Sequence, residues 1–187
     1  MRIILARHGE TDYNKNKKVQ GHSDIPLNEE GIRQGKEAGK KLEGHEIDVA
    51  YSSTLERAFD TARYMLDNSN SENNKSLSVI KDKRLIEKSY GGYEGVSFAE
   101  YGAGLKAGET RGMELDTEAA DRVEEFFKEK YNEHPDKTIL AVCHGGLIRS
   151  FLTKKGIKEV SRGVIINTSI SVLDYDGEKF TLVEFNK

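Results

Sequence analysis

The 187-residue sequence contains one cysteine, two prolines and no tryptophan. A single cysteine cannot form an intramolecular disulfide, which excludes a small secreted domain held together by disulfides and favours a reducing compartment. No stretch approaches the roughly 18 consecutive apolar residues of a membrane-spanning helix, and the chain opens on a strand-like run instead of a signal segment. We therefore expect a cytoplasmic protein that does not bind membranes.

An excess of charge of one sign is also missing. Lys plus Arg total 29 and Asp plus Glu total 32, which gives a formal net charge of −3. Without a basic excess we expect no nucleic-acid partner, and any anion-binding function must come from a local group of cations. Apolar residues make up 36% of the chain, enough for one core at this length. Residues 1–187 are therefore predicted to form a single domain.

Short apolar runs alternate along the chain with segments of helical periodicity. Strands are expected at residues 3–6, 47–52, 77–80, 138–143, 163–166, 169–173 and 180–185. Helices are expected after a cap at Asn28, at 55–66, at 119–131 and from 147 onward, where apolar side chains recur every three or four residues. This alternation predicts an α/β domain of three layers, with helices flanking a mostly parallel central sheet.

The segment from about residue 90 to 116 has frequent glycine and poor periodicity. It is predicted to be a long loop with one helical turn. Long ordered loops on compact domains are often functional. We therefore expect this segment to be a lid or specificity loop over the binding site.

Basic and glycine residues follow three of the predicted strands. Arg7 and His8 follow the first strand, His144 and Gly145 follow the strand at 138–143, and Arg57 lies just after the strand at 47–52. Ligands of open α/β sheets bind beyond the carboxyl ends of the strands, so these residues are expected to share one pocket. Two arginines and two histidines suit a dianionic phosphate, which arginine binds through two parallel hydrogen bonds.

The order of the motifs resembles that of the histidine phosphatase superfamily, in the small phosphatases of its phosphoglycerate mutase-like branch. The resemblance rests on Leu5–Thr11 with Asn14 and Gln20–Gly21, on Asp24–Gly31, on Ser52–Ser53 with Arg57, on Leu85–Glu87 with Gly91–Gly95, on Val142–Gly146 and on Asn167–Ile170. These pieces occur in the family's order over nearly the whole chain, which makes the match far more specific than one Arg-His-Gly tripeptide.

The resemblance implies a histidine acid-type phosphatase, a phosphoric monoester hydrolase that needs no metal and no cofactor. His8 would attack phosphorus to give a phosphohistidine, which water then hydrolyses. A backbone carbonyl beside the other ring nitrogen of His8 would fix the reactive tautomer. Glu87 would protonate the leaving group and then activate water, a role that calls for a carboxyl with a raised pKa.

The resemblance also implies a set of phosphate-binding residues. Arg7, Arg57 and His144 would neutralise the phosphoryl oxygens in the transition state. Further substrate contacts are expected from Asn14, Gln20, Gly21 and Gly145.

Several of these residues have plainer alternatives. The acid could be a downstream carboxylate in place of Glu87, namely Glu94, Glu100, Glu109 or Glu114. Gln20–Gly21 could be a simple turn, and the lysines at 15–18 either a solvated loop or a binding surface for an anionic substrate tail. Cys143 is expected to pack in the core. His22, His45 and His134 lack the spacing of a zinc site.

The expected substrate is a small phosphorylated metabolite, such as a sugar phosphate, a phosphoglycerate, a nucleoside-like phosphate or a ribazole phosphate. The alternatives are a cofactor-dependent phosphoglycerate-type mutase, a protein phosphatase with a shallow pocket, and a non-catalytic phospholigand-binding module. The chain lacks the long insert of the mutases, which favours hydrolysis, and all five catalytic candidates are present, which argues against the binding module. A monomer or a homodimer is expected.

Overall fold

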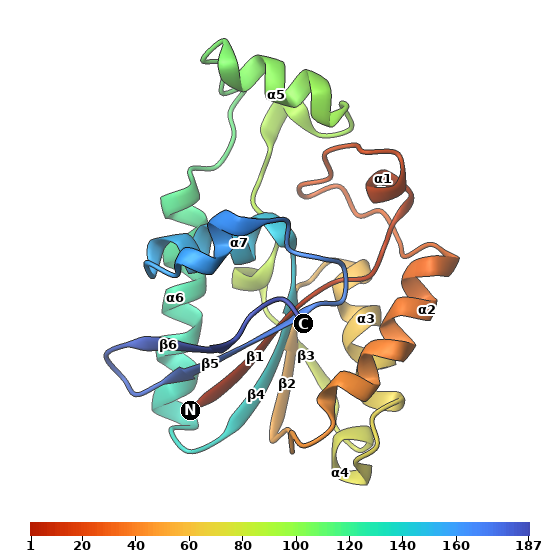
Figure 1. Cartoon of the computed structure of the whole chain (residues 1–187), viewed down its shortest axis with the longest axis vertical. Helices are drawn as coiled ribbons and strands as arrows, with labels where there is room; N and C mark the ends of the chain where they lie inside the picture. The colour runs from red at the N-terminus through yellow and green to blue at the C-terminus, as the bar shows by residue number, and fades with distance from the viewer.

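The computed structural model describes residues 1–187, apart from the side chain of Arg162, and shows helices on both faces of one six-stranded sheet (Figure 1). The strands are β1 (Arg2–Arg7), β2 (Val49–Ser52), β3 (Val79–Lys81), β4 (Thr138–Cys143), β5 (Ile170–Tyr175) and β6 (Phe180–Glu184). The α-helices are α1 (Asp12–Lys15), α2 (Glu29–Ala38), α3 (Glu56–Asp67), α4 (Glu72–Lys75), α5 (Phe98–Lys106), α6 (Asp116–Glu133) and α7 (Gly145–Lys154). Short 3-10 helices are η1 (Gly39–Leu42), η2 (Lys83–Leu85), η3 (Gly91–Tyr93) and η4 (Lys158–Arg162).

The sheet has the strand order β3-β2-β4-β1-β5-β6. Strands β3, β2, β4 and β1 are parallel, whereas β5 and β6 are antiparallel to their neighbours. The prediction of a three-layer α/β domain with a mostly parallel sheet is therefore confirmed. Most strand boundaries differ from the predicted ones by one or two residues, while β4 matches its prediction in full.

The central strand β1 supplies apolar side chains to both faces of the sheet, because successive residues of a strand point to opposite sides. Ile3 and Leu5 join the core beneath α6 and α7, and Ile4 and Ala6 join the core beneath α2 and α3. All four side chains are buried. This explains why the run at 3–6 is continuously apolar instead of alternating with polar residues.

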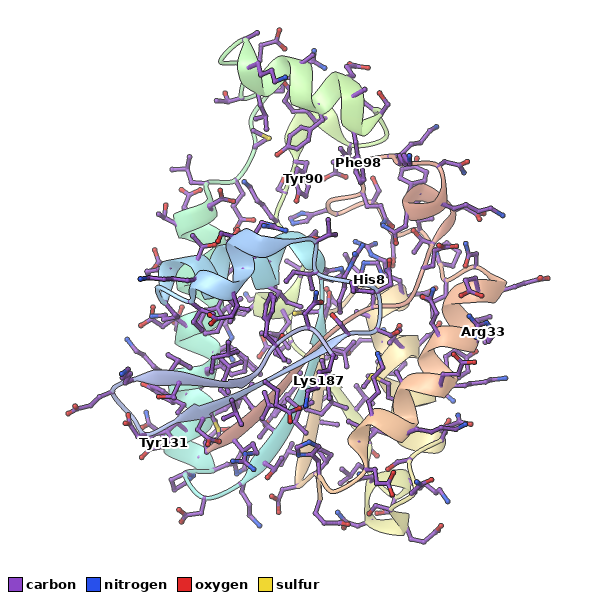
Figure 2. The ribbon with its side chains drawn as sticks, in the orientation of Figure 1. His8, Arg33, Tyr90, Phe98, Tyr131 and Lys187 are labelled. Atoms are coloured by element: carbon purple, nitrogen blue, oxygen red, sulfur yellow. The ribbon has the colours of Figure 1, made fainter. Side chains whose placement is uncertain are left out.

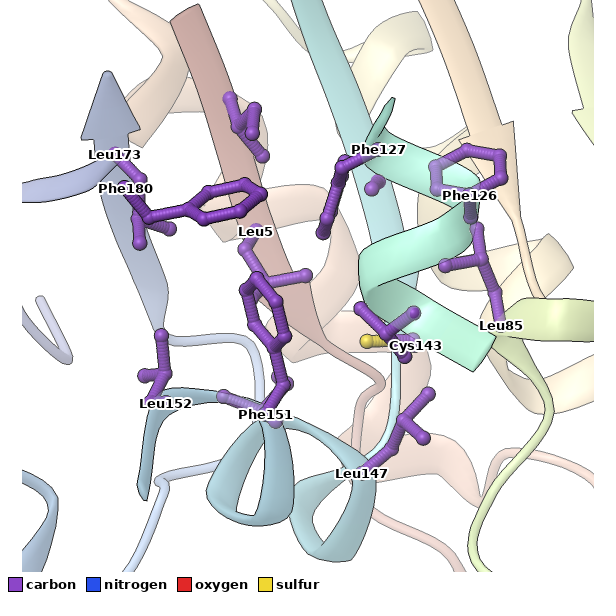
Figure 3. Packing of buried hydrophobic residues seen from close by; sticks show 14 of the residues in the cluster. Leu5, Leu85, Phe126, Phe127, Cys143, Leu147, Phe151, Leu152, Leu173 and Phe180 are labelled. Atoms are coloured by element: carbon purple, nitrogen blue, oxygen red, sulfur yellow. The ribbon is translucent and has the colours of Figure 1, made fainter. Parts of the chain in front are cut away.

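Aromatic side chains fill the core beneath α6 and α7 (Figure 3). Phe127 of α6 packs against Phe151 of α7 with ring centroids 5.4 Å apart, and Phe180 of β6 completes the group. Burying each such ring stabilises the fold by about 1.5–3 kcal/mol. The core therefore fixes α7, whose first turn forms part of the site described below.

Small residues bring the other helical layer close to the strands. Asn28 caps α2, as predicted, by accepting the N–H of Gly31 at 2.9 Å. Gly31 in turn packs against the backbone that follows β1, where a side chain on it would overlap the Glu10 carbonyl. The outer face of α2 is charged, and Arg33 points away from the sheet (Figure 2).

The segment 90–116 contains a longer helix than predicted. Instead of one helical turn, it forms the nine-residue α5, which stands apart from the sheet (Figure 1). Ser97 caps this helix through its hydroxyl. Gly104 lowers the helix propensity of this segment, yet a glycine is needed there to let the ring of Tyr93 pack against the helix.

The prediction of a strand at 163–166 is wrong, because this segment is a loop. Val164 and Ile166 alternate as in a strand, yet their side chains are 71% and 58% exposed. Side chains replace the missing strand partner: Arg149 donates to the Gly163 carbonyl at 2.6 Å, and Asn186 donates to that of Val164 at 3.0 Å. Across the described residues, no helix has the length and apolar character needed to span a membrane.

We predict opposite effects of the same substitution at two helical glycines. Gly31→Ala should lower the free energy of unfolding by about 2 kcal/mol, because the new methyl group overlaps backbone atoms of Glu10. Gly102→Ala is the matched control: apart from its own turn of helix, no atom lies within 4 Å of the added carbon, so the higher helix propensity of alanine should stabilise the protein by about 0.5–1 kcal/mol. Urea denaturation measures both, and a stabilised Gly31→Ala variant would contradict the packing described here.

Candidate active site

The carboxyl ends of three adjacent strands, β2, β4 and β1, bring the predicted residues together. The parallel register pairs Arg7 of β1 with Cys143 of β4, and the His8 N–H donates to the Cys143 carbonyl at 2.9 Å. His8 and His144 consequently leave neighbouring strands at the same level, with ring centroids 5.1 Å apart. Arg57 arrives from the first turn of α3, which follows β2.

His8 is a buried residue whose tautomer is set by the backbone. Its Nδ1 lies 2.6 Å from the Gly9 carbonyl oxygen. Because a carbonyl only accepts, the proton resides on Nδ1 and the lone pair of Nε2 is free. Burial, together with the charges of Arg57 and Arg7, lowers the pKa of His8 well below its ordinary value. The ring is therefore neutral near pH 7, as a nucleophile must be.

Two arginines flank this histidine with part of each guanidinium unbonded. Arg7 donates Nη1 to the Ile165 carbonyl at 2.5 Å, and Arg57, fully buried, donates to two carbonyls of the 21–23 loop at 2.7 and 2.8 Å. Burial lowers the pKa of both groups, and the nearby charge of Glu87 opposes that shift. Guanidinium groups remain charged across the physiological range. The site therefore holds two fixed positive charges.

His144 is fully buried and begins helix α7 as its N-cap residue. Burial, reinforced by the positive charge of Arg57, lowers its pKa well below the ordinary value. Over the described residues, four buried side-chain nitrogen or oxygen atoms lack a hydrogen-bond partner: Nδ1 and Nε2 of His144, Nε of Arg7 and Nε of Arg57. Such atoms are rare because each costs free energy, so four at one place indicate a site built for a polar ligand.

Glu87 enters the site between η2 and η3 and caps helix α7. Its carboxylate accepts backbone N–H groups from Leu147 and Lys88 at 2.8 Å and from Gly146 at 3.2 Å. Gly146 permits this approach, since a Cβ there would lie 2.9 Å from the Glu87 oxygen. The carboxylate thus lies at the positive end of the helix that starts at His144.

A cavity of about 390 Å³ opens over these groups. Figure 2 shows His8 between the sheet and α5, with Tyr90 and Phe98 on the α5 side. His8 is 2% exposed and Phe98 is 50% exposed, so the cavity runs from a buried inner end to an open mouth. This volume accommodates a phosphoryl group and a small organic moiety.

Seven predicted site residues line the cavity: Arg7, His8, Asn14, Gln20, Gly21, Glu87 and Gly145. The other two, Arg57 and His144, are fully buried. Gln20–Gly21 is a turn and a wall of the cavity at once, because Gly21 has a φ of 59° and its carbonyl binds Arg57 at 2.8 Å. The binding roles of these residues stay predictions.

The rival carboxylates do not line the cavity: Glu94, Glu100, Glu109 and Glu114. The first accepts backbone N–H groups of residues 22 and 23, the next two bind Arg111, and the last binds Arg122. Of the five glutamates considered for the acid, Glu87 alone lines the cavity. Cys143 is buried as predicted, and burial raises the pKa of its thiol.

Sequence reasoning missed most of the cavity wall contributed by the lid. Tyr90, Phe98 and Tyr101 lie there, beside an ion pair of 2.6 Å between Lys88 and Asp116. Of the lysines at 15–18, Lys18 lines the cavity, and a contact with an anionic substrate tail stays a prediction. No group of three or more His, Cys, Asp or Glu side chains able to hold a metal ion occurs within the described part of the chain.

The fold and the site define an α/β protein of the phosphoglycerate mutase-like class. A family model described as histidine phosphatase superfamily (branch 1) matches residues 3–187, and the chain belongs to this family. The resemblance seen in the sequence motifs is thereby confirmed.

Three relatives illustrate the match. The chain is 30% identical over 186 residues to an uncharacterized phosphatase, PhoE, of Bacillus subtilis, covering 98% of this chain and 93% of that one. A mycobacterial glucosyl-3-phosphoglycerate phosphatase, solved with VO3, has a TM-score of 0.81 at 27% identity over 99% and 98% of the two chains. A phosphoglycerate mutase structure from Bacillus anthracis has a TM-score of 0.88 at 24% identity, over 100% and 93% of the chains, and shows the shared fold.

The lowered pKa values of His8 and His144 predict acid-sensitive stability in the ligand-free protein. Both rings are neutral when folded but take up protons near pH 6.5 when unfolded. The free energy of unfolding is therefore unaffected by these rings above about pH 6.5. It falls as the pH drops below that value, with a slope of at most about 1.4 kcal/mol per pH unit for each ring.

Urea denaturation at pH 7.5, 6.5 and 5.5 checks this prediction. The His144→Asn variant should lose less stability than wild type between pH 6.5 and 5.5, because one of the two rings is gone. An unchanged slope in the variant would assign the acid sensitivity to other groups.

Proposed function

We propose that the protein hydrolyses the phosphate monoester of a small metabolite, without a metal ion, through a phosphohistidine on His8. The observation that carries this proposal is the ring of unpartnered buried nitrogens on Arg7, Arg57 and His144 around a neutral histidine. A dianionic phosphoryl group can accept hydrogen bonds from Nε of Arg7, from Nε of Arg57 and from the one N–H that a neutral His144 carries, and it balances the two guanidinium charges.

The reaction follows from these positions in two steps. In the first, Nε2 of His8 forms a bond to phosphorus while the bond to the leaving oxygen breaks, and Glu87 gives that oxygen a proton. In the second, a water molecule gives a proton to Glu87 and attacks phosphorus, which releases His8 and inorganic phosphate. Arg7, Arg57 and His144 stabilise the equatorial oxygens in both transition states.

The distribution of cations favours hydrolysis over phosphoryl transfer within a bisphosphate. A mutase must hold a second phosphate, yet Lys88 is paired with Asp116 and Arg149 donates to the backbone carbonyls of the 160–163 segment. Of the described cations that line the cavity away from His8, Lys18 binds neither a carboxylate nor a backbone carbonyl. The phosphatase names of two of the relatives above support the same choice.

The depth of the cavity supports a metabolite as the partner. A reactive ring that is 2% exposed suits a small phosphate ester better than the side chain of a folded protein. We assign the enzyme to the histidine acid-type phosphatases, as a monomer or homodimer, and to the cytoplasm, where its one buried thiol stays reduced.

The first test is hydrolysis of p-nitrophenyl phosphate in excess EDTA. Wild-type activity should survive chelation, because the cations of the site are side chains. His8→Ala should lose at least about a thousandfold in kcat, since the nucleophile is gone. His45→Ala is the matched control, because His45 lies before β2, at the opposite end of the sheet. Near-wild-type turnover by His8→Ala would falsify the covalent mechanism.

The second test separates the acid from the nucleophile. Glu87→Gln should slow hydrolysis of phenyl phosphate by about a hundredfold or more, because phenolate leaves poorly without a proton. Hydrolysis of p-nitrophenyl phosphate should fall much less, since nitrophenolate departs unprotonated. Equal losses in kcat/KM on both esters would count against Glu87 as the acid.

A further inference from the structure

The segment that carries Glu87 is held by a side chain from another part of the chain. Arg122 of helix α6 donates to three of its backbone carbonyls, those of Arg84 at 2.7 Å, Ile86 at 2.6 Å and Glu87 at 3.0 Å. Only η2 provides regular structure here, so few backbone hydrogen bonds fix the segment. One planar guanidinium presents five donors in a fixed fork and so reaches carbonyls spread along the segment, whereas the three donors of a lysine all leave a single nitrogen.

Glu114 holds this guanidinium in place. Its two oxygens accept from Nε and Nη2 of Arg122 at 2.9 and 3.1 Å. The two side chains are 19% and 18% exposed, so solvent screens the pair less than a surface ion pair. Burial acts to raise the pKa of Glu114, but hydrogen bonds from Arg122 and the Ser89 N–H outweigh it and keep the pKa below its ordinary value.

Glu114 also closes the base of the lid. Its carboxylate accepts the N–H of Ser89 and its own N–H donates to the Ser89 carbonyl, both at 3.0 Å. Ser89 lies two residues after Glu87, at the start of the lid, and Glu114 lies at its end. Arg122 and Glu114 therefore act on the acid from both sides along the chain.

We propose that Arg122 and Glu114 are positioning residues for the proposed acid: together they place the Glu87 carboxylate over the leaving-group oxygen. The inference rests on the proposed function, because it concerns how well Glu87 transfers a proton. Proton transfer requires heavy atoms about 2.6–3.2 Å apart, and a misplacement of about 1 Å can cost up to a hundredfold in rate. A loosened backbone at residues 84–87 therefore impairs catalysis even in a protein that stays folded.

A purely structural pair would lower stability without changing how the enzyme responds to the leaving group. Arg84 offers the matched control, because it belongs to the same segment and its side chain is 18% exposed. It binds Asp82 and Glu129 through their carboxylates and makes no side-chain hydrogen bond to a backbone carbonyl in the described structure. Arg84→Ala removes a comparable ion pair and leaves the binding of the acid segment by Arg122 in place.

The experiment compares kcat/KM for p-nitrophenyl phosphate and phenyl phosphate in Arg122→Lys, Arg122→Ala, Glu114→Gln and Arg84→Ala. Arg122→Lys keeps the charge but loses most of the carbonyl contacts. It should raise the ratio of nitrophenyl to phenyl turnover by about tenfold, and Glu114→Gln should raise it in the same direction. Arg84→Ala should lower Tm with no change in the ratio. If Arg122→Ala does not fold, the two conservative variants decide the question.

A double variant tests whether Arg122 acts through Glu87. Adding Arg122→Lys to Glu87→Gln should leave the ratio where Glu87→Gln alone puts it, since the acid is already gone. Equal losses on both esters in Arg122→Lys, with a selective loss in Glu87→Gln, overturn the positioning role alone. Equal losses in Glu87→Gln overturn the acid role and the positioning role together, so the two failures are distinguishable.

Discussion

The parallel register between β1 and β4 is the constraint on which the site depends. The hydrogen bond from His8 to the Cys143 carbonyl places the two histidines at one level, and every other group of the site is arranged around them. A slip of one residue would exchange the side chains of the two faces, so Ile3 and Leu5 would point into the core that Ile4 and Ala6 now fill. The packing of the two cores therefore secures the geometry of the site.

The site is electrostatically costly for the folded protein. Fully buried Arg57 carries a charge whose removal from water costs several kcal/mol, and backbone carbonyls and the Glu87 carboxylate offset only part of that. The same burial that lowers stability lowers the pKa of His8 and so keeps its ring neutral. Stability and reactivity thus both depend on one property, the burial of charged and titratable groups at this end of the sheet.

The sequence was enough to predict the sheet, the histidines and the arginines, because all of them follow from buried strands and their carboxyl ends. Helix α5 is longer than predicted because its two glycines have low helix propensity, and one of them, Gly104, is required by the packing of Tyr93. The prediction of a strand at 163–166 is wrong because alternating apolar residues do not show whether a neighbouring strand is there to pair with them. The contacts of Arg122 could not be predicted from the sequence. An arginine on an amphipathic helix is usually solvated, and the sequence does not show which backbone carbonyls lie near it.

The meeting of Ser89 and Glu114 at the base of the lid has a consequence for how such a domain diversifies. The two ends of the intervening segment are thereby held together, and the segment is held a second time at residues 94–98, where Glu94 binds the N–H groups of residues 22 and 23 and the backbone pairs with residues 17–19. Doubling the length of a flexible loop adds only about 0.6 kcal/mol of closure entropy. Insertions or deletions in and after α5, beyond residue 98, can therefore alter what the cavity admits while the sheet, the histidines and Glu87 keep their places.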